Sequence, residues 1–264
     1  MGGRLDFIHF IIRLSGQQKN EIRRWFRDNK LFPNAIGVVD GVEIVLQRGP
    51  PLDTKAWITR KSNFGMGGTG VVDHRGIFTF FSTGYPGSIH DATAFKSTDL
   101  YRNKDEYFQG EDYLLADAAY PMTSFMVPRY KAPSVNEARF NALHGSARVV
   151  VEHGFGMPKQ KFPSLSCLSV DISSARGMRK ASRWVLACVV IHNFIRLDAN
   201  GVLDELEVAN VVEDADNDID NEFDDNQYNI DDAARNERRE GPLKRNQLKV
   251  EVLRLERERR RRRR

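Results

Sequence analysis

The sequence is poor in cysteine: Cys167 and Cys188 are the only two among 264 residues. Two cysteines are too few for a disulfide framework or for a cysteine-based zinc site. Disulfide-stabilised secreted proteins and cysteine-ligated metal proteins are therefore excluded as classes. This cysteine usage is typical of a reducing compartment, the cytosol or the nucleus.

Long apolar runs are also missing. The longest, residues 184–191, is far shorter than the roughly 20 residues that a membrane-spanning helix needs. The apolar N-terminal segment, residues 5–14, is interrupted by Asp6, His9 and Arg13, which is not typical of a secretory signal. We therefore expect a soluble intracellular protein without a membrane partner.

Basic residues are absent from one segment near the end of the chain, and acidic residues are scarce in the segment that follows it. Residues 204–232 contain 13 acidic residues and no lysine or arginine, whereas residues 233–264 contain 14 basic residues against 5 acidic ones and end in six arginines. Because the whole chain has a net charge of +4, residues 1–203 carry +8. A basic main domain and an arginine-rich end favour a polyanionic partner, although basic charge can also serve solubility alone.

Aromatic residues nearly vanish beyond residue 203, where Phe223 and Tyr228 are the only ones. Such a composition cannot bury enough surface to offset the entropy cost of ordering. We predict that residues 199–264 form a disordered tail, acidic and then arginine-rich, because a short helix through Leu248 and Val252 would be marginal by itself. The final run of arginines is typical of a nuclear-localisation or nucleic-acid-binding patch, with low-complexity drift as the alternative.

The main domain alternates β-branched segments with segments of helical spacing. Residues 15–31 predict a leading helix, and residues 34–49 predict a strand, a bend at an Asp-Gly pair and a second strand. Residues 68–87 predict two strands joined by a hairpin turn. Together these patterns predict an α/β domain built on one mixed sheet. Further predicted elements are a helix in residues 88–103, a buried strand in 111–117, and helices in 136–155 and 173–197.

Four acidic residues lie within or after apolar segments, beside small residues: Asp40, Asp91, Asp117 and Glu152. Each has a purely structural interpretation. Asp40 suits a hairpin turn, and Asp117 suits the cap of a helical turn. Asp91 suits a capping box with a serine three residues earlier. Glu152 suits an exposed ion pair with Arg148, one helical turn before it.

As a set, the same acids predict a metal site. Strand ends and a facing helix can bring three or four carboxylates together, and such a cluster repels itself unless it holds a cation. Ligation by oxygen alone suits Mg²⁺ or Mn²⁺. Two such ions about 4 Å apart can activate the attacking oxygen and stabilise the leaving oxygen of a phosphodiester. A phosphodiester substrate also agrees with the basic charge of the domain.

Five segments stand out by their order: IGVVDGVEI, TRKSNFGMGGTGVVDHRGIFTFFSTGYPGSIHDATAFKSTDLY, LLADAAYP, ARFNALHGSARVVVEHGFG and VVIHNFI. This ordered set resembles PIF/Harbinger transposases and the nucleases derived from them, over about residues 30–198. The resemblance implies a DDE nuclease domain with an RNase H-like fold, a mixed sheet flanked by helices, in residues 34–198. Residues 1–33 would form an N-terminal helical lead-in.

The resemblance also implies roles for individual residues. Asp40, Asp117 and Glu152 would be catalytic, and all three together with Asp91 would hold a divalent cation, Mg²⁺ or Mn²⁺. It implies a nuclear protein whose partners are DNA and a separate Myb-like DNA-binding companion, and it leaves a homo-oligomer open. Four basic residues are candidates for contacts with DNA phosphates: Arg60, Lys61, Arg148 and Lys159.

Two departures from the family pattern bear on function. Residues 155–159 read FGMPK where family members read FGRLK or close to it, and Pro158 is predicted to end its helix soon after Glu152. Family members usually carry a helix-turn-helix region ahead of the first aspartate, where this chain has about 35 residues. A truncated gene model and a domesticated remnant both fit that length.

The leading interpretation is a metal-dependent DNA endonuclease that cleaves phosphodiester bonds. The rival is a catalytically silent DNA- or chromatin-binding protein that keeps the transposase fold. Retention of all four acids favours the first, whereas the two departures favour the second. A plain intracellular phosphoesterase would leave the arginine-rich end unexplained.

Overall fold

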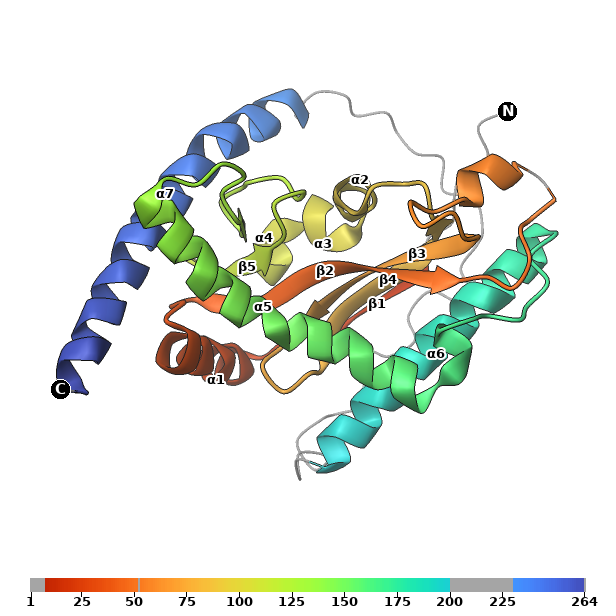
Figure 1. The fold of residues 1–264 in the computed structure, drawn as a ribbon, viewed down its shortest axis with the longest axis horizontal. Coiled ribbons are helices and arrows are strands. Elements are labelled where there is room, and N and C mark those ends of the chain that lie inside the picture. The colour runs from red at the N-terminus through yellow and green to blue at the C-terminus, as the bar shows by residue number, and fades with distance from the viewer. Residues whose placement is uncertain (1–7, 52, 200–229, 264) are drawn as a thin grey trace.

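A six-stranded mixed sheet lies at the centre of the protein (Figure 1). The computed structural model describes residues 8–51, 53–199 and 230–263. The strands follow the order β1-β4-β3-β2-β5-β6 across the sheet. They are β1 (Ile8–Ile11), β2 (Ala35–Val45), β3 (Gly65–Val72), β4 (Phe78–Pro86), β5 (Tyr113–Ala116) and β6 (Met126–Pro128).

The strand β2 joins an antiparallel half of the sheet to a parallel half. On one side β2 pairs antiparallel with β3, which pairs antiparallel with β4, and β4 pairs antiparallel with β1. On the other side β2 pairs parallel with β5, and β5 pairs parallel with β6. The predicted α/β domain on one mixed sheet is therefore confirmed, and its topology is consistent with an RNase H-like fold.

Helices cover both faces of the sheet (Figure 1). The long helices α5 (Val135–Lys161) and α6 (Ala175–Ala199) pack on one face. The short helices α2 (Asp91–Lys96), α3 (Asp99–Arg102) and α4 (Lys104–Tyr107) cover the other. Among the described residues, every helix falls short of the length and hydrophobicity that crossing a bilayer requires. The remaining helical segments are α1 (Gly16–Trp25), the π-helical turn η1 (Phe26–Lys30), the 3-10 turns η2 (Thr54–Trp57) and η3 (Pro163–Leu165), and α7 (Ile230–Arg262).

Alternation along β2 divides its side chains between two cores. Val38 and Ile44 belong to the larger core, which α5 and α6 cover, whereas Val39 belongs to the smaller core on the α2 side. Successive side chains of a strand point to opposite faces of the sheet. Asp40 therefore lies on the α5 face, and Gly41 lies on the α2 face.

The Asp-Gly pair of β2 does not form the predicted bend. β2 is unbroken, and every residue from Val38 to Val45 is paired with β3. Continuous pairing with a buried neighbouring strand outweighs the turn preference of this dipeptide. The predicted lead-in is also helical only in part, because Ile8–Ile11 form β1 at the edge of the sheet before α1 begins.

Pro158 does not end α5, contrary to the sequence prediction. The helix continues to Lys161. A proline inside a helix loses one backbone hydrogen bond and crowds the carbonyl of the residue four positions earlier, which here is Gly154. Pro158 is buried on the side of α5 that faces the sheet, and Gly154 packs closely on Val72. Apolar burial of the ring thus offsets the lost hydrogen bond.

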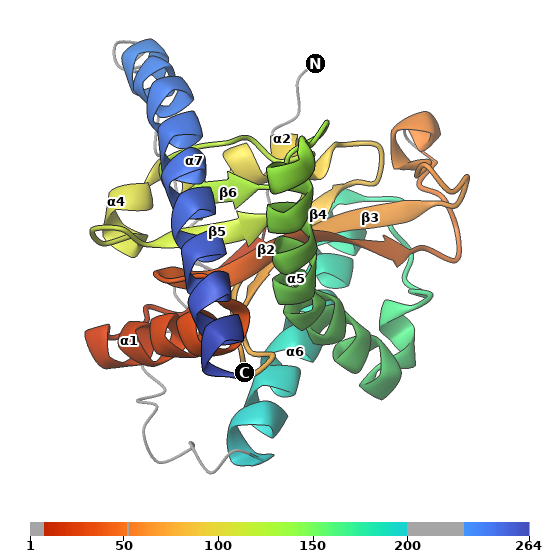
Figure 2. The ribbon, with the colours of Figure 1, turned by 60° about the vertical axis from the view of Figure 1, so that its left-hand side comes forward.

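The arginine-rich helix α7 lies alongside α5 and β6 (Figure 2). Leu248 and Val252 of α7 are buried in the larger core. Glu256 of α7 pairs with Arg139 of α5. The predicted disorder of residues 199–264 is therefore wrong for residues 230–262, because tertiary packing supplies the stability that the isolated segment lacks. Residues 200–229, which hold most of the acidic segment, lie outside the described residues.

A matched pair of leucines tests this docking of α7. Leu248 is 5% exposed, whereas Leu243 on the same helix is 62% exposed. We expect Leu248→Ala to lower the free energy of unfolding by about 3 kcal/mol, because a buried leucine loses both its transfer energy and its packing. Leu243→Ala should change it by less than about 0.5 kcal/mol. Urea unfolding of both variants measures this, and equal effects would mean that α7 does not dock.

Candidate active site

Asp40 lies within β2, and Asp117 directly follows β5, the parallel neighbour of β2. The register pairs Val38 of β2 with Leu115 of β5, so each acid lies two residues beyond the same pair. β5 ends at Ala116 while β2 continues to Val45. The space beyond the end of β5 is therefore lined by the continuing edge of β2. Such places, at the carboxyl ends of parallel strands, commonly bind ligands in open α/β sheets.

Arg148 of α5 bridges these two acids. Its Nη2 donates to Oδ2 of Asp40 at 2.5 Å, and its Nη1 donates to Oδ1 of Asp117 at 3.1 Å. Arg148 is only 9% exposed. The sequence predicted that Arg148 contacts DNA phosphates, but in this structure its guanidinium bonds to the two aspartates. Asp40 and Asp117 hold one cationic group between them, and we call them the acid pair.

Arg129 is a neighbour of the acid pair that sequence analysis missed. Its Nη2 donates to Oδ1 of Asp117 at 2.7 Å. The parallel register pairs Ala116 of β5 with Pro128 of β6, so Asp117 and Arg129 follow matched positions. The signal was the short apolar segment before Arg129, because recognising it as a strand beside β5 would have placed the two residues together.

The pKa values of the two acids are shifted in opposite directions. Burial raises the pKa of Asp40, and nearby Asp117 adds to this, while the guanidinium of Arg148 opposes it. Partial burial alone would raise the pKa of Asp117 as well. There the backbone N–H of Ala118 and the guanidinium groups of Arg148 and Arg129 outweigh burial and lower the pKa. Asp117 is therefore the more firmly ionised member of the pair.

Asp91 approaches β2 from the opposite face of the sheet. It is the first residue of α2, whose N-cap is His90 without a side-chain hydrogen bond, so the predicted capping box does not form. A Cβ added to Gly41 would lie 2.1 Å from Cγ of Asp91, so only glycine leaves room for this carboxylate. Partial burial and then Asp40 raise the pKa of Asp91. Asp91 thus acts electrostatically on the acid pair from across the strand.

Glu152 does not join the acid pair in this structure. It lies on α5 four residues after Arg148, is exposed, and lines an open groove together with Trp25 and His74. Within the described part of the chain, no ion pair links it to Arg148, whose partners are Asp40 and Asp117. The structure therefore brings together Asp40, Asp117 and, from the other face, Asp91.

The other predicted DNA contacts lie near the far end of β2. Arg60 and Lys61 are exposed, and a guanidinium nitrogen of Arg60 bonds Nδ1 of His90, beside Asp91. Lys159 of α5 donates from Nζ to the carbonyl of Glu43 on β2 at 3.0 Å. Burial, and then the nearby Lys61, lower the pKa of Lys159. These cations flank the continuation of β2 beyond the acid pair.

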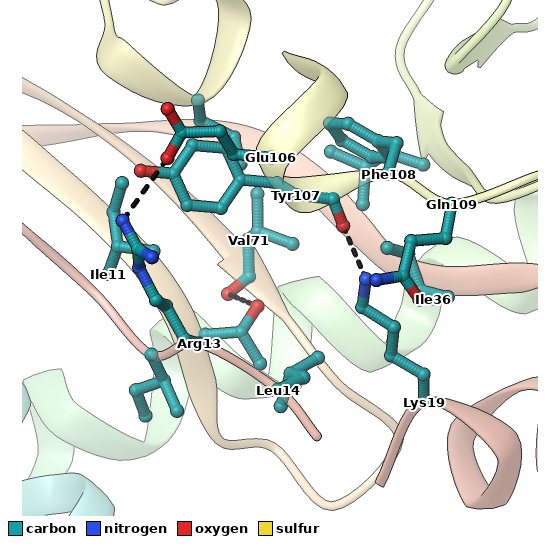
Figure 3. A pocket seen from close by; sticks show the side chains of 14 residues that line it. Ile11, Arg13, Leu14, Lys19, Ile36, Val71, Glu106, Tyr107, Phe108 and Gln109 are labelled. Atoms are coloured by element: carbon teal, nitrogen blue, oxygen red, sulfur yellow. Dashed lines mark hydrogen bonds and ion pairs between the residues drawn. The ribbon is translucent and has the colours of Figure 1, made fainter. Parts of the chain in front are cut away.

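A separate cavity of about 230 Å³ lies between β1, α1 and the α3–α4 segment (Figure 3). Its walls are mostly apolar side chains. Its charged groups are bound within the protein: Nζ of Lys19 donates to the carbonyl of Tyr107 at 2.7 Å, and Arg13 pairs with Glu106 at 3.1 Å. This cavity lacks the convergent acids of a hydrolytic site, so the acid pair remains the candidate.

The acid pair fits a hard divalent cation in part. Its donors are carboxylate oxygens, which Mg²⁺ and Mn²⁺ prefer, and the pair already holds a positive group. Among the residues that the structure describes, however, no three His, Cys, Asp or Glu side chains form a group that could hold a metal ion. Asp40 and Asp117 are therefore the two ligands that the arrangement offers, with the guanidinium of Arg148 between them.

Comparison with known proteins gives a consistent result. The family model described as DDE superfamily endonuclease matches residues 39–193, which include Asp40, Asp91, Asp117 and Glu152. A curated protein of Arabidopsis thaliana, Protein ALP1-like, is 23% identical over 193 residues, covering 67% of this chain and 46% of that protein. The chain thus spans about half the length of this relative. No solved structure matches the chain. Because the family model covers more than half of the sequence, the chain belongs to the DDE superfamily endonuclease family.

Proposed function

We propose that this protein is a divalent-metal-dependent DNA endonuclease derived from a Harbinger-type transposase, with an RNase H-like fold. The observation that carries the proposal is the acid pair, in which two aspartates from adjacent parallel strands share one cation. Family membership supports the class of reaction, the cleavage of DNA phosphodiester bonds. For a protein that acts on chromosomal DNA, we propose the nucleus as its compartment.

Asp40 and Asp117 would hold the metal. When bound, a divalent cation would supply Lewis acidity toward the phosphodiester and lower the pKa of a water molecule. Asp117 suits this role because its neighbours keep it ionised. Asp40 is the more buried of the two side chains, and partial exclusion of water strengthens its electrostatic interactions.

Glu152 is the third acid in this proposal. A helical side chain leans toward the N-terminus of its helix, so Glu152 is inclined toward the turn that carries Arg148. Four residues correspond to about 6 Å along the helix axis, which a glutamate can span in part. Because Glu152 is exposed, it can change its rotamer without breaking a core. Asp91, predicted from the sequence as a further ligand, would support the site from the α2 face through its charge.

DNA would approach along the continuation of β2. Arg60 and Lys61 are exposed there, and Lys159 lies on the α5 side of the same strand. Cations in this position would contact the phosphate backbone, which fixes the position of DNA but reads no sequence. A Myb-like companion, and a second copy of the chain, are further partners that the resemblance suggests.

The rival function, a catalytically silent DNA-binding protein, has one observation in its favour. Arg148 neutralises the acid pair without any metal. A transposase fold that had lost catalysis could keep such ion pairs for stability alone. The two functions differ in one measurable property: only the endonuclease cleaves DNA, and it does so only with metal.

Removal of metal tests the proposed function directly. We expect the protein to nick supercoiled plasmid in Mn²⁺, to stop when EDTA is added, and to resume when free Mn²⁺ is restored. The requirement follows because the attacking water molecule needs a Lewis acid to lower its pKa, which carboxylates and guanidinium groups do not supply. Nicking that continues in EDTA would overturn the metal mechanism, and absence of nicking under all conditions would favour the silent binding protein.

A further inference from the structure

We propose that Arg148 is the built-in counter-cation of the acid pair, and that a divalent cation binds by displacing its guanidinium. This inference rests on the proposed function, because it assumes that metal binds at Asp40 and Asp117. It assigns to Arg148 a positioning role: it holds the two carboxylates together before metal arrives. The displaced guanidinium then becomes available to the DNA phosphate.

The need for a resident cation follows from the charges. Asp40 and Asp117 are neighbours on adjacent strands, and each is partly withdrawn from water, with side chains 25% and 33% exposed. Two ionised carboxylates in such a place repel each other. The guanidinium of Arg148 reduces this repulsion, because one of its terminal nitrogens donates to each acid. Without this group, the repulsion between the two carboxylates would be uncompensated in the absence of metal.

The same contacts allow the exchange. In the described structure Nε of Arg148 is buried and has no hydrogen-bond partner, so only the terminal nitrogens fasten the guanidinium. Both of these bonds go to the carboxylates that would bind metal. A divalent cation that takes those oxygens therefore releases the whole group at once. Arg129 differs, because it contacts Asp117 alone and its side chain is 41% exposed.

The released guanidinium would remain near the acid pair, because its side chain is tethered to α5. Its planar fork matches the oxygens of a phosphate group, to which arginine binds in bidentate fashion. Arg148 would thus favour DNA only after metal has occupied the acid pair. Metal loading and the capture of the phosphodiester are coupled in this way by one side chain.

The first test compares Mn²⁺ affinities by isothermal titration calorimetry, with the full chain and no DNA. In Arg148→Gln the metal no longer has to displace the bridging guanidinium, so we expect Mn²⁺ to bind about tenfold more tightly or better, given about 1.5–3 kcal/mol for hydrogen bonds to charged groups. Arg129→Gln is the matched control, since it removes a cation from Asp117 without opening the bridge. We expect its affinity to change by less than about threefold, because the pair is partly exposed.

Asp40→Asn separates the inference from the function on which it rests. If Asp40→Asn leaves Mn²⁺ binding unchanged, the metal lies elsewhere and the proposed function fails. If Asp40→Asn abolishes binding while Arg148→Gln binds Mn²⁺ no more tightly than the wild type, only the exchange is wrong.

A second measurement uses the wild-type chain and so does not depend on the folding of a variant. With ¹⁵N-labelled arginine, the Nε–H of Arg148 is expected to give a protected NMR signal, which Arg148→Lys would assign by its loss. We expect Mg²⁺ to shift this signal and to speed its exchange with water, because the guanidinium leaves the acids. An unchanged signal at saturating Mg²⁺ would show that Arg148 stays in place and would overturn the exchange.

Discussion

Replacing Asp117 with asparagine will abolish metal-dependent DNA cleavage while leaving the protein folded. The substitution keeps the size of the side chain and removes the charge that holds the cation. Because a bound metal contributes several kcal/mol to the stabilisation of a phosphoryl transition state, we expect plasmid nicking in Mn²⁺ to fall at least about a hundredfold. Asp40→Asn should lose cleavage to a similar extent.

The two variants should differ in stability. The pKa of Asp117 is lowered by its neighbours, so its ionised form stabilises the fold at neutral pH, and this contribution is lost as the pH falls through its folded pKa. The pKa of Asp40 is raised, so its charge opposes folding at neutral pH. In EDTA at pH 7, Asp117→Asn should therefore unfold at lower urea than Asp40→Asn. Cleavage that survives in Asp117→Asn would remove Asp117 from the mechanism.

Glu152→Gln will also lose cleavage, by at least about a hundredfold, if Glu152 completes the metal site. The side chain is exposed, so stability in EDTA should change by less than about 0.5 kcal/mol. Binding of DNA in Ca²⁺, measured by fluorescence anisotropy, should persist, because Arg60 and Lys61 supply phosphate contacts elsewhere.

His153 provides a matched control for Glu152. It is the next residue on α5, is also exposed, and lines the same groove. His153→Gln should cleave as well as the wild type, since the proposed metal site does not include this side chain. Full cleavage by Glu152→Gln would restrict the catalytic acids to Asp40 and Asp117, whereas equal loss in both variants would point to the groove rather than to the carboxylate.

Much of the fold was predictable because local patterns and burial agree. The apolar segment before Asp117 forms β5, and the β-branched residues around Asp40 form β2, as their composition indicates. The Asp-Gly pair misled the prediction, because its glycine has a tertiary function. Gly41 leaves space for the carboxylate of Asp91, and this requirement comes from another element far along the chain.

The partner of Arg148 could not be predicted from sequence. Helical spacing shows that Arg148 and Glu152 are neighbours on the surface of α5, but it does not show which of the two side chains faces the sheet. In the structure α5 turns Arg148 toward the acid pair and leaves Glu152 on the exposed side. The packing of α7 was hidden for a related reason, because Leu248 finds its apolar neighbours only in the folded domain.

The most direct test of the central claim is a crystal of the full chain soaked in Mn²⁺, with anomalous scattering used to locate the metal. We expect a manganese peak in contact with carboxylate oxygens of both Asp40 and Asp117, and the guanidinium of Arg148 withdrawn from them. A soaked crystal in which Arg148 still bridges the two acids, with manganese bound only elsewhere, would contradict it.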